Sequence, residues 1–325
     1  MEIKNKIIMN EKTIITPFKA TFTGIGQVMF QQSFWTGLVF LAGIFWGSYE
    51  CNLPQVAWGA LVGAVAATLT GYIVRPDSPD IEAGLDGFNG TLVGCAFPTF
   101  LTNDWQMWIA LVFCSAITVW VRIGFNNVMA PWKVNSLTFP FVFMTWIFLF
   151  ASRMMNGIES APAGLSTPEF SQQFTFGLDC SFGDLVVYWL KGISQVFLIN
   201  SWVTGIFFLV ALALCSRWAA LWAAVASALS LFVAIVFEAN PHDIANGLFG
   251  FSPVLTGIAV GCTFYKPCLR SAVWTLLAIV ATVFVQAGMD AFFTPFGLPT
   301  LTGPFCITTW LFLLPCFKLT SDKNK

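Results

Sequence analysis

The chain has 325 residues, of which 57% are hydrophobic and only 10% are charged, and its mean hydropathy is +0.77. Soluble domains carry about 25% charged residues, so this composition argues against a water-soluble enzyme and indicates a polytopic membrane protein. The net charge of −1 argues against a nucleic-acid binder, which needs a basic face.

Both ends of the chain are basic. Lysine and arginine near membrane spans tend to remain cytoplasmic, so we expect cytoplasmic tails at 1–21 and 318–325 and an even number of spans. The alternative is that these lysines only solubilise the tails. No secretory signal is expected, because the first residues carry charges and a proline in place of an apolar core.

Apolar stretches follow one another along the chain with short polar breaks. In the first half they lie near 20–32, 34–50, 54–74, 106–130 and 136–152. In the second half they lie near 186–200, 202–215, 218–238, 271–293 and 301–317. Ten spans agree with two cytoplasmic termini.

Three blocks of sequence occur twice, in the same order. Residues 24–37 match 192–205 with seven identities, 84–94 match 247–257 with six, and 137–149 match 301–313 with eight. Chance would give roughly one match in ten positions. We therefore expect a first repeat at 22–153, an external linker at 154–184 and a second repeat at 185–317. Five spans in each repeat make the second repeat inverted relative to the first.

This topology also predicts on which side charged residues lie. It places Lys133, Lys266 and Arg270 inside, with Arg122 near that side. It places seven acidic residues outside, namely Asp77, Asp80, Glu82, Glu159, Glu169, Asp179 and Asp184.

One segment in each repeat does not fit as a full span. Residues 84–100 contain four glycines, an Asn, an Asp and a Pro, and 247–263 is the matching segment. Short Gly- or Pro-interrupted segments at matching places in inverted halves point to a transport site. We expect re-entrant half-helices within 80–100 and 242–263, which meet near the midplane. A short helix buried for packing is the alternative.

The polar residues that repeat around these segments are neutral. Gln27 matches Gln195, and Thr138 matches Thr302. Each Thr stands two residues before a Pro, which frees backbone carbonyls at the start of a span. Two symmetric hydroxyls beside such carbonyls predict a shared polar ring, although a Thr bonded back to its own helix is the packing alternative. The repeated apolar pairs are candidate pore walls or core: Val28 with Val196, Phe88 with Phe251, and Leu92 with Leu255.

The sequence gives little support for a metal site, a catalytic site or an ion-coupled pathway. The nine cysteines form no CxxC pair and His242 is the only histidine, so neither a metal site, a cofactor, a disulfide framework nor an enzyme is expected. No symmetric acid or base pair is recognised between the interfaces. Since intramembrane ionisable residues mark ion-coupled pathways, we expect passive movement of a neutral polar solute. An ion-coupled symporter of a small neutral amide or amino acid is the alternative.

The pairs GIGQV/GISQV, GLDGFNGTLVG/GLFGFSPVLTG and LTFPF/LTGPF resemble the urea transporter family, over about Phe22 to Cys316. The resemblance, to a bacterial member akin to the vertebrate transporters, implies a multi-pass protein of the cell membrane, here the bacterial inner membrane. It also implies a homotrimer in which each protomer has its own narrow, open pore. Urea would be the solute, with small amide analogues as further candidates.

The resemblance assigns roles to residues of this chain. One binding slot would use Phe30 and Phe88 with Gln27, and the other would use Phe251 with Gln195. The constriction between them would use Thr138, Thr302, Val28, Val196, Leu92 and Leu255. The chain departs from the family at two places in the second slot, which we expect on the inner side. Phe251 is followed by Ser252-Pro253, and Leu198 stands at the position equivalent to Phe30, so this pair supplies one aromatic wall.

Overall fold

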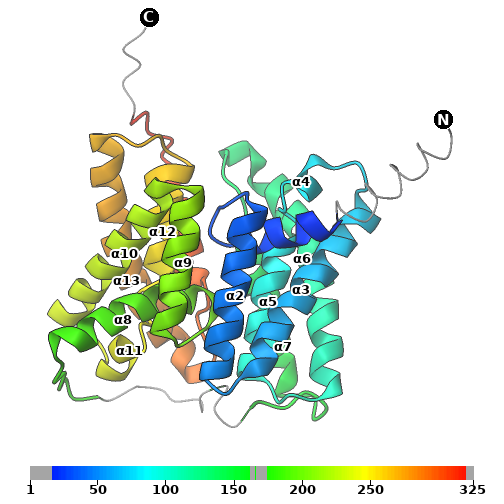
Figure 1. Ribbon diagram of the computed structural model, residues 1–325, viewed down its shortest axis with the longest axis horizontal. Helices are drawn as coiled ribbons and strands as arrows, with labels where there is room; N and C mark the ends of the chain where they lie inside the picture. The colour runs from blue at the N-terminus through cyan, green and yellow to red at the C-terminus, as the bar shows by residue number, and fades with distance from the viewer. Residues whose placement is uncertain (1–16, 162–164, 166–173, 320–325) are drawn as a thin grey trace, which may run out of the picture.

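The computed structural model describes residues 17–161, 165 and 174–319, whose regular elements are all helices (Figure 1). Residues 17–27 form the first helix. The rest of the first half holds α2 (Phe34–Glu50), α3 (Pro54–Val74), α4 (Pro79–Glu82), α5 (Gly87–Phe100), α6 (Trp105–Met129), η1 (Ala130–Trp132) and α7 (Phe139–Ser152). The second half holds α8 (Phe182–Ser194), η2 (Gln195–Phe197), α9 (Trp202–Cys215), α10 (Arg217–Val236), α11 (Pro241–Ala245), α12 (Phe251–Ile258), η3 (Ala259–Thr263), α13 (Leu269–Phe293), η4 (Thr294–Phe296) and α14 (Gly303–Leu313).

Polar side chains fix where the helices begin. The hydroxyl oxygens of Ser33, Ser201 and Ser216 accept hydrogen bonds from the third residue of α2, α9 and α10. Asp104 caps α6 in the same way, with 2.9 Å between its Oδ1 and the backbone nitrogen of Met107. Such caps satisfy amide groups that the helix itself leaves free, which matters most where water is scarce.

Four helical stretches are long and apolar enough to cross a membrane: α3, α6 with η1, α10, and α13 with η4. Large apolar side chains such as Trp35 and Ile109, which are 71% and 60% exposed, cover the outer surface. In water such exposure is unfavourable, whereas lipid solvates it. The structure therefore confirms an all-helical, multi-pass membrane protein.

A sharp bend joins α8 with η2 to α9. The two helices meet at 72°, the geometry of a broken span or of a re-entrant loop. The turn before α9 contains Leu198 in the left-handed region, with φ of 58°. Phe30 has φ of 62° at the matching place in the first half, between the helix of 17–27 and α2. The predicted spans 20–32 and 186–200 thus each run into a sharp turn.

The glycines of 84–100 serve close helix packing. Most of α5 is buried, and its backbone lies directly against α3. A Cβ at Gly94 would lie 2.0 Å from the carbonyl oxygen of Gly59, and a Cβ at Gly63 would lie 2.1 Å from that of Gly90. No side chain fits at such distances, so the packing alone explains why these positions are glycine.

The two halves contact each other reciprocally. The indole nitrogen of Trp146 donates to the carbonyl oxygen of Pro299, and that of Trp310 donates to Asn135, both over 2.9 Å. The two donors, Trp146 and Trp310, are 164 residues apart, and so are the two acceptors, Asn135 and Pro299. When a residue of one half bonds to a residue of the other half, and the repeat equivalents of these two residues bond to each other as well, the contacts have the pattern of a twofold axis.

Helices α2 and α9 meet in the same reciprocal manner. The hydroxyl of Thr36 donates to the carbonyl oxygen of Ala211 over 3.4 Å, and that of Thr204 donates to Gly43 over 2.8 Å. Here the shared offset is 168 residues, as in the first repeated block of the sequence. The duplication is therefore visible in the packing of the two halves as well as in their residues.

Figure 1 shows where the two small helices lie. The helix of 17–27, the last described residues before 320 and α4 lie toward one end of the bundle, and α11 lies toward the opposite end. The Arg122 guanidinium contacts the Asp80 carboxylate at 2.9 Å, so both residues lie on the same side. The expectation that Asp80 lies outside while Arg122 lies near the inside is therefore wrong.

Candidate functional site

Two of the cavities in the described part of the chain hold the predicted site residues, one at the α4 end and one at the α11 end. The α4 cavity has a volume of about 400 Å³, and its wall includes Asp80 of α4. The α11 cavity has a volume of about 220 Å³, and its wall includes Asp243 of α11. Because α4 and α11 lie at opposite ends (Figure 1), the cavities enter from opposite sides.

The two predicted threonines lie where the two cavities approach each other. Thr138 lines the α4 cavity and Thr302 lines the α11 cavity, and their hydroxyl oxygens lie 2.6 Å apart. Both side chains are buried, and the Sγ atom of Cys306 lies 3.3 Å from the Thr138 hydroxyl. Each Thr precedes the first residue of a helix, α7 or α14, that carries Pro in its first turn. The symmetric hydroxyls of the sequence are thus in direct contact.

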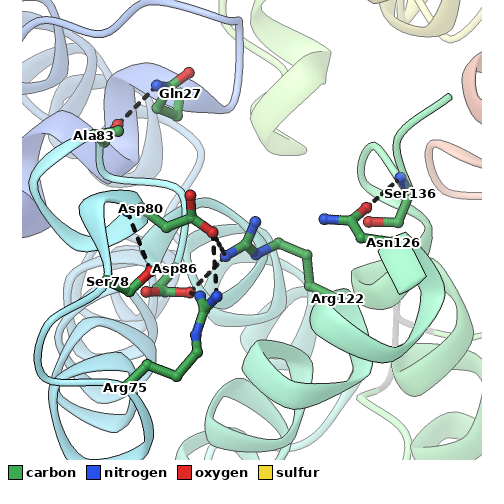
Figure 2. A network of polar contacts seen from close by, with 9 residues as sticks. All are labelled: Gln27, Arg75, Ser78, Asp80, Ala83, Asp86, Arg122, Asn126 and Ser136. Carbon is green, nitrogen blue, oxygen red and sulfur yellow. Dashed lines mark hydrogen bonds and ion pairs between the residues drawn. The ribbon is translucent and has the colours of Figure 1, made fainter. Parts of the chain in front are cut away.

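The predicted glutamines stand one in each cavity with equivalent hydrogen bonds. The Nε2 atom of Gln27 donates to the carbonyl oxygen of Ala83 over 2.7 Å (Figure 2). The Nε2 atom of Gln195 donates to the carbonyl oxygen of Asn246 over 2.9 Å. Since one amide end is engaged, the Oε1 oxygen of each Gln is the group available to accept from a solute.

Aromatic side chains line both cavities. Phe30 and Phe88 line the α4 cavity, and Phe251 lines the α11 cavity, as assigned by the resemblance. Sequence reasoning missed three further rings on the walls, namely Phe264 in the α4 cavity and Phe100 and Phe141 in the α11 cavity. Phe141 matches Phe305 in the third repeated block, so the repeat could have found it, whereas Phe100 and Phe264 are not among the matched identities.

The rest of the second slot also differs from expectation. Leu198 lines the α11 cavity at the position equivalent to Phe30, and Ser252 is fully buried in the first turn of α12. The α11 cavity lies at the end opposite the helix of 17–27 and the last described residues before 320 (Figure 1). The expected inner position of this slot and the expected cytoplasmic termini therefore cannot both hold.

The predicted apolar constriction residues divide into two groups. Val28 lines the α4 cavity and Val196 lines the α11 cavity. Leu92 and Leu255 have no exposed surface and pack in the hydrophobic core rather than on either cavity wall. The valines are thus placed beside the threonines' cavities, whereas the leucines are placed behind them.

An ion-pair network borders the α4 cavity (Figure 2). The Arg122 guanidinium lies 2.9 Å from the Asp80 carboxylate and 2.8 Å from the Asp86 carboxylate, and Arg75 contacts the same two acids at 3.3 and 2.9 Å. The network ties together α3, α4, α5 and α6. Two arginines balance two aspartates, so the buried charges are compensated locally.

The network changes the titration of Asp80. Burial alone raises the pKa of this carboxyl, but the hydrogen bond and charge of Arg122, followed by those of Arg75, outweigh burial. The pKa of Asp80 therefore lies below its ordinary value of 3.8. Asp80 stays ionised at neutral pH.

The α11 cavity has acids without such partners. Asp243 and Asp290 line it, together with Gln286 and Thr300. Asp80 and Asp243 stand 163 residues apart and each lines a cavity, so they form a repeated acid pair that sequence reasoning did not recognise. Burial raises the pKa of Asp243, although the hydrogen bond and charge of His242 oppose this effect. The repeat offset was the signal that could have found the pair.

The arrangement suits a flat, uncharged solute that offers N–H groups. Amide oxygens lie at each entrance, hydroxyls lie where the cavities meet, and aromatic faces lie between them. These groups accept or exchange hydrogen bonds and replace part of a hydration shell. Within the described residues no cluster of three or more His, Cys, Asp or Glu side chains could hold a metal ion.

Comparison with known proteins gives the same family as the motifs. The profile of the urea transporter family (UT) matches residues 18–316. Urea transporter 1 of Ovis aries is 32% identical over 298 residues, which cover 90% of this chain and 75% of the relative. Urea transporter 1 of Mus musculus is 30% identical over 314 residues, which cover 94% of this chain and 79% of the relative. The chain belongs to the urea transporter family.

Proposed function

We propose that the protein is a passive, channel-like transporter that conducts urea across a membrane down its gradient. The observation that carries this proposal is the contact of the Thr138 and Thr302 hydroxyls, which joins two opposed cavities through neutral groups. Their 2.6 Å contact makes the junction narrow, so a solute passes only where it exchanges its water for these hydroxyls. The protein is a transporter and not an enzyme.

The proposed binding chemistry follows from the shape of urea. Urea is flat, carries N–H donors along its edges and has one carbonyl acceptor. At the α4 entrance the Oε1 atom of Gln27 would accept an N–H while Phe30 and Phe88 cover the faces. At the α11 entrance Gln195 and Phe251 would play the same parts. Such edge-and-face recognition selects flat solutes with N–H groups over round solutes.

The proposed architecture is two inverted repeats, 22–153 and 185–317, with ten crossings. The reciprocal bonds between the halves support a twofold relation. For the two re-entrant half-helices, the helix of 17–27 and α8 fit better than 80–100 and 242–263. The reason is that α8 with η2 meets α9 at 72°, whereas the glycines of α5 serve contact with α3.

The proposed assembly is a homotrimer in which each protomer holds its own passage. This proposal rests on the family resemblance, and the mass of the purified protein in detergent would test it. The proposed location is a cell membrane, namely the bacterial inner membrane, whose proteins cross it as helices.

Stopped-flow light scattering on proteoliposomes tests the function. We expect urea efflux that exceeds that of empty liposomes and does not depend on proton or sodium gradients. Formamide and acetamide as parallel solutes would define the range of amides. Flux that disappears when ion gradients are collapsed would favour an ion-coupled symporter, for which the urea transporter family gives no support.

A further inference from the structure

The two cavities differ in charge at equivalent positions. Arg122 lines the α4 cavity and pairs with Asp80, and 164 residues later Gln286 lines the α11 cavity. Asn126 lines the α4 cavity, and by the same offset Asp290 lines the α11 cavity. The first exchange removes a positive charge from the α11 cavity, and the second replaces an amide with a carboxyl group. Compared with the equivalent α4 cavity, the α11 cavity is therefore the more acidic of the two.

The charge of the α11 cavity is uncompensated on its own walls. Asp243 and Asp290 are the acidic residues of its lining, and neither Lys nor Arg is among the described residues that line it. Asp290 accepts a hydrogen bond from the Thr300 hydroxyl over 2.8 Å, which leaves its second oxygen available. His242 lies 3.4 Å from Asp243, but its side chain is 78% exposed and screened by water.

Basic residues near this end are engaged elsewhere. The Lys191 ammonium donates to the carbonyl oxygen of Ala245 over 3.3 Å. The Arg153 guanidinium donates to the carbonyl oxygens of Phe296 and Gly297 over 2.8 and 3.4 Å. Neither side chain lines the cavity, and neither contacts its two carboxylates.

A buried acceptor on the same wall points to a donor-rich ligand. Gln286 is 2% exposed and lines the α11 cavity, and its Nε2 atom donates to the carbonyl oxygen of Leu248. Its Oε1 atom has no hydrogen-bond partner in the part of the chain that the structure describes. A buried carbonyl without a donor is unfavourable, so a ligand N–H here would remove that cost. One helical turn separates Gln286 from Asp290, which places both on the same face of α13.

The free groups of the cavity therefore match a small flat cation. Asp243, Asp290, Gln286 and Gln195 all offer oxygen acceptors, and Phe251 offers a ring face to a positive charge. Guanidinium has donors on every edge, no acceptor to satisfy and the planar outline of urea. We propose that the α11 cavity is a binding site for guanidinium-type cations, which occupy the entrance and block the passage of urea. The blocking half of this proposal rests on the proposed function, whereas the binding half does not.

Calorimetric titration tests binding directly. Guanidinium chloride at low millimolar concentration is titrated into the trimer or monomer as purified in detergent, at pH 8, with sodium chloride in the reference titration. We expect saturable binding that weakens about tenfold in Asp243→Asn and in Asp290→Asn, because each loses a charged hydrogen-bond acceptor. Glu159→Gln is the matched control, since it removes an exposed carboxylate that does not line the cavity. Its binding should equal that of the wild type.

Three outcomes would overturn the binding site: no saturable heat, equal binding of sodium, or equal loss in Glu159→Gln. Equal thermal unfolding temperatures would show that the Asn variants fold. Urea efflux in the presence of guanidinium tests the block, and binding without inhibition would overturn that half. Should the protein conduct no urea at all, the titration still decides whether the cation site exists.

Discussion

The α4 and α11 cavities are built from the same repeated parts but carry different charge. Each holds a Gln, a Val, a Phe and a Thr at equivalent positions. In the α4 cavity Arg122 neutralises Asp80, whereas in the α11 cavity Gln286 stands at the equivalent position and leaves Asp243 without an arginine partner. Groups that touch a neutral solute have thus been kept in both halves, and the charges around them have diverged.

The comparison also separates two structural roles. The paired charges of the α4 end join four helices, so they serve stability there. The acids of the α11 end hold no such network together, and they remain free to affect what enters. Substitutions at the equivalent positions that differ in charge should therefore have unequal effects on folding and on flux.

The largest expected effect comes from Arg122→Gln, which gives the α4 cavity the residue of the α11 cavity. It leaves the buried Asp86 carboxylate with Arg75 alone, and removal of one partner from a buried ion pair costs about 3–5 kcal/mol. We expect a loss of about 3 kcal/mol, since Arg75 keeps part of the compensation. Thermal unfolding in detergent measures it.

The matched control is Gln286→Ala at the equivalent position. It removes one hydrogen bond to Leu248 and should cost about 1 kcal/mol. Equal losses in the two variants would contradict the structural role of the arginine network.

The next effect concerns the double variant Thr138→Val with Thr302→Val. Replacing both partners of a buried hydrogen bond by apolar groups of the same shape is nearly neutral for stability. The solute, however, loses the hydroxyls that replace its water, so we expect urea flux to fall about tenfold. Stopped-flow efflux measures the rate, and the elution volume and thermal unfolding temperature report the fold. Unchanged flux would assign both hydroxyls to packing.

A smaller effect is expected from Gln27→Leu and from Gln195→Leu. Each removes an acceptor at one entrance and one hydrogen bond, to Ala83 or to Asn246. We expect each variant to lower urea flux about threefold, by the loss of one solute contact worth somewhat under 1 kcal/mol. The two should be alike, because both bonds are neutral and equivalent. A large effect at one entrance only would show that charge, rather than the repeated parts, controls entry.

Much of the site could be predicted because the two repeated halves of the sequence can be compared with each other. Gln27 with Gln195 and Thr138 with Thr302 stood out as repeated polar residues in apolar surroundings, and the structure places each pair symmetrically. Membership of the family was predicted from the same blocks. A search for identities, however, ignores positions where the halves differ. The charges of Arg122 and Asp290 were missed for this reason.

The path of the chain was harder to predict. Hydropathy cannot distinguish a span from a helix that turns back, and the turn at Phe30 adopts a positive φ without glycine or proline to mark it. Glycine does not distinguish the two either, since Gly90 and Gly94 also allow α5 to touch α3. Which backbone atoms approach one another depends on tertiary packing, which composition does not encode.

The smallest expected effect is on pH dependence, and its sign differs between the two repeated acids. The folded pKa of Asp80 lies below its ordinary value, so the unfolded state binds more protons and this group stabilises the fold above pH 3.8. That contribution is lost as pH falls further. The folded pKa of Asp243 is raised, so this group contributes stability below pH 3.8 that is lost as pH rises through the folded pKa.

Thermal unfolding between pH 3 and 7 of the wild type, Asp80→Asn and Asp243→Asn measures the two contributions. At neutral pH Asp80→Asn should be less stable than the wild type, and this difference should shrink as the pH falls. Asp243→Asn should become more stable relative to the wild type as the pH rises toward neutral. Both changes should be about 1 kcal/mol or less, because both carboxylates are partly exposed to water. Parallel curves for the two variants would mean that the arginines do not distinguish the α4 cavity from the α11 cavity.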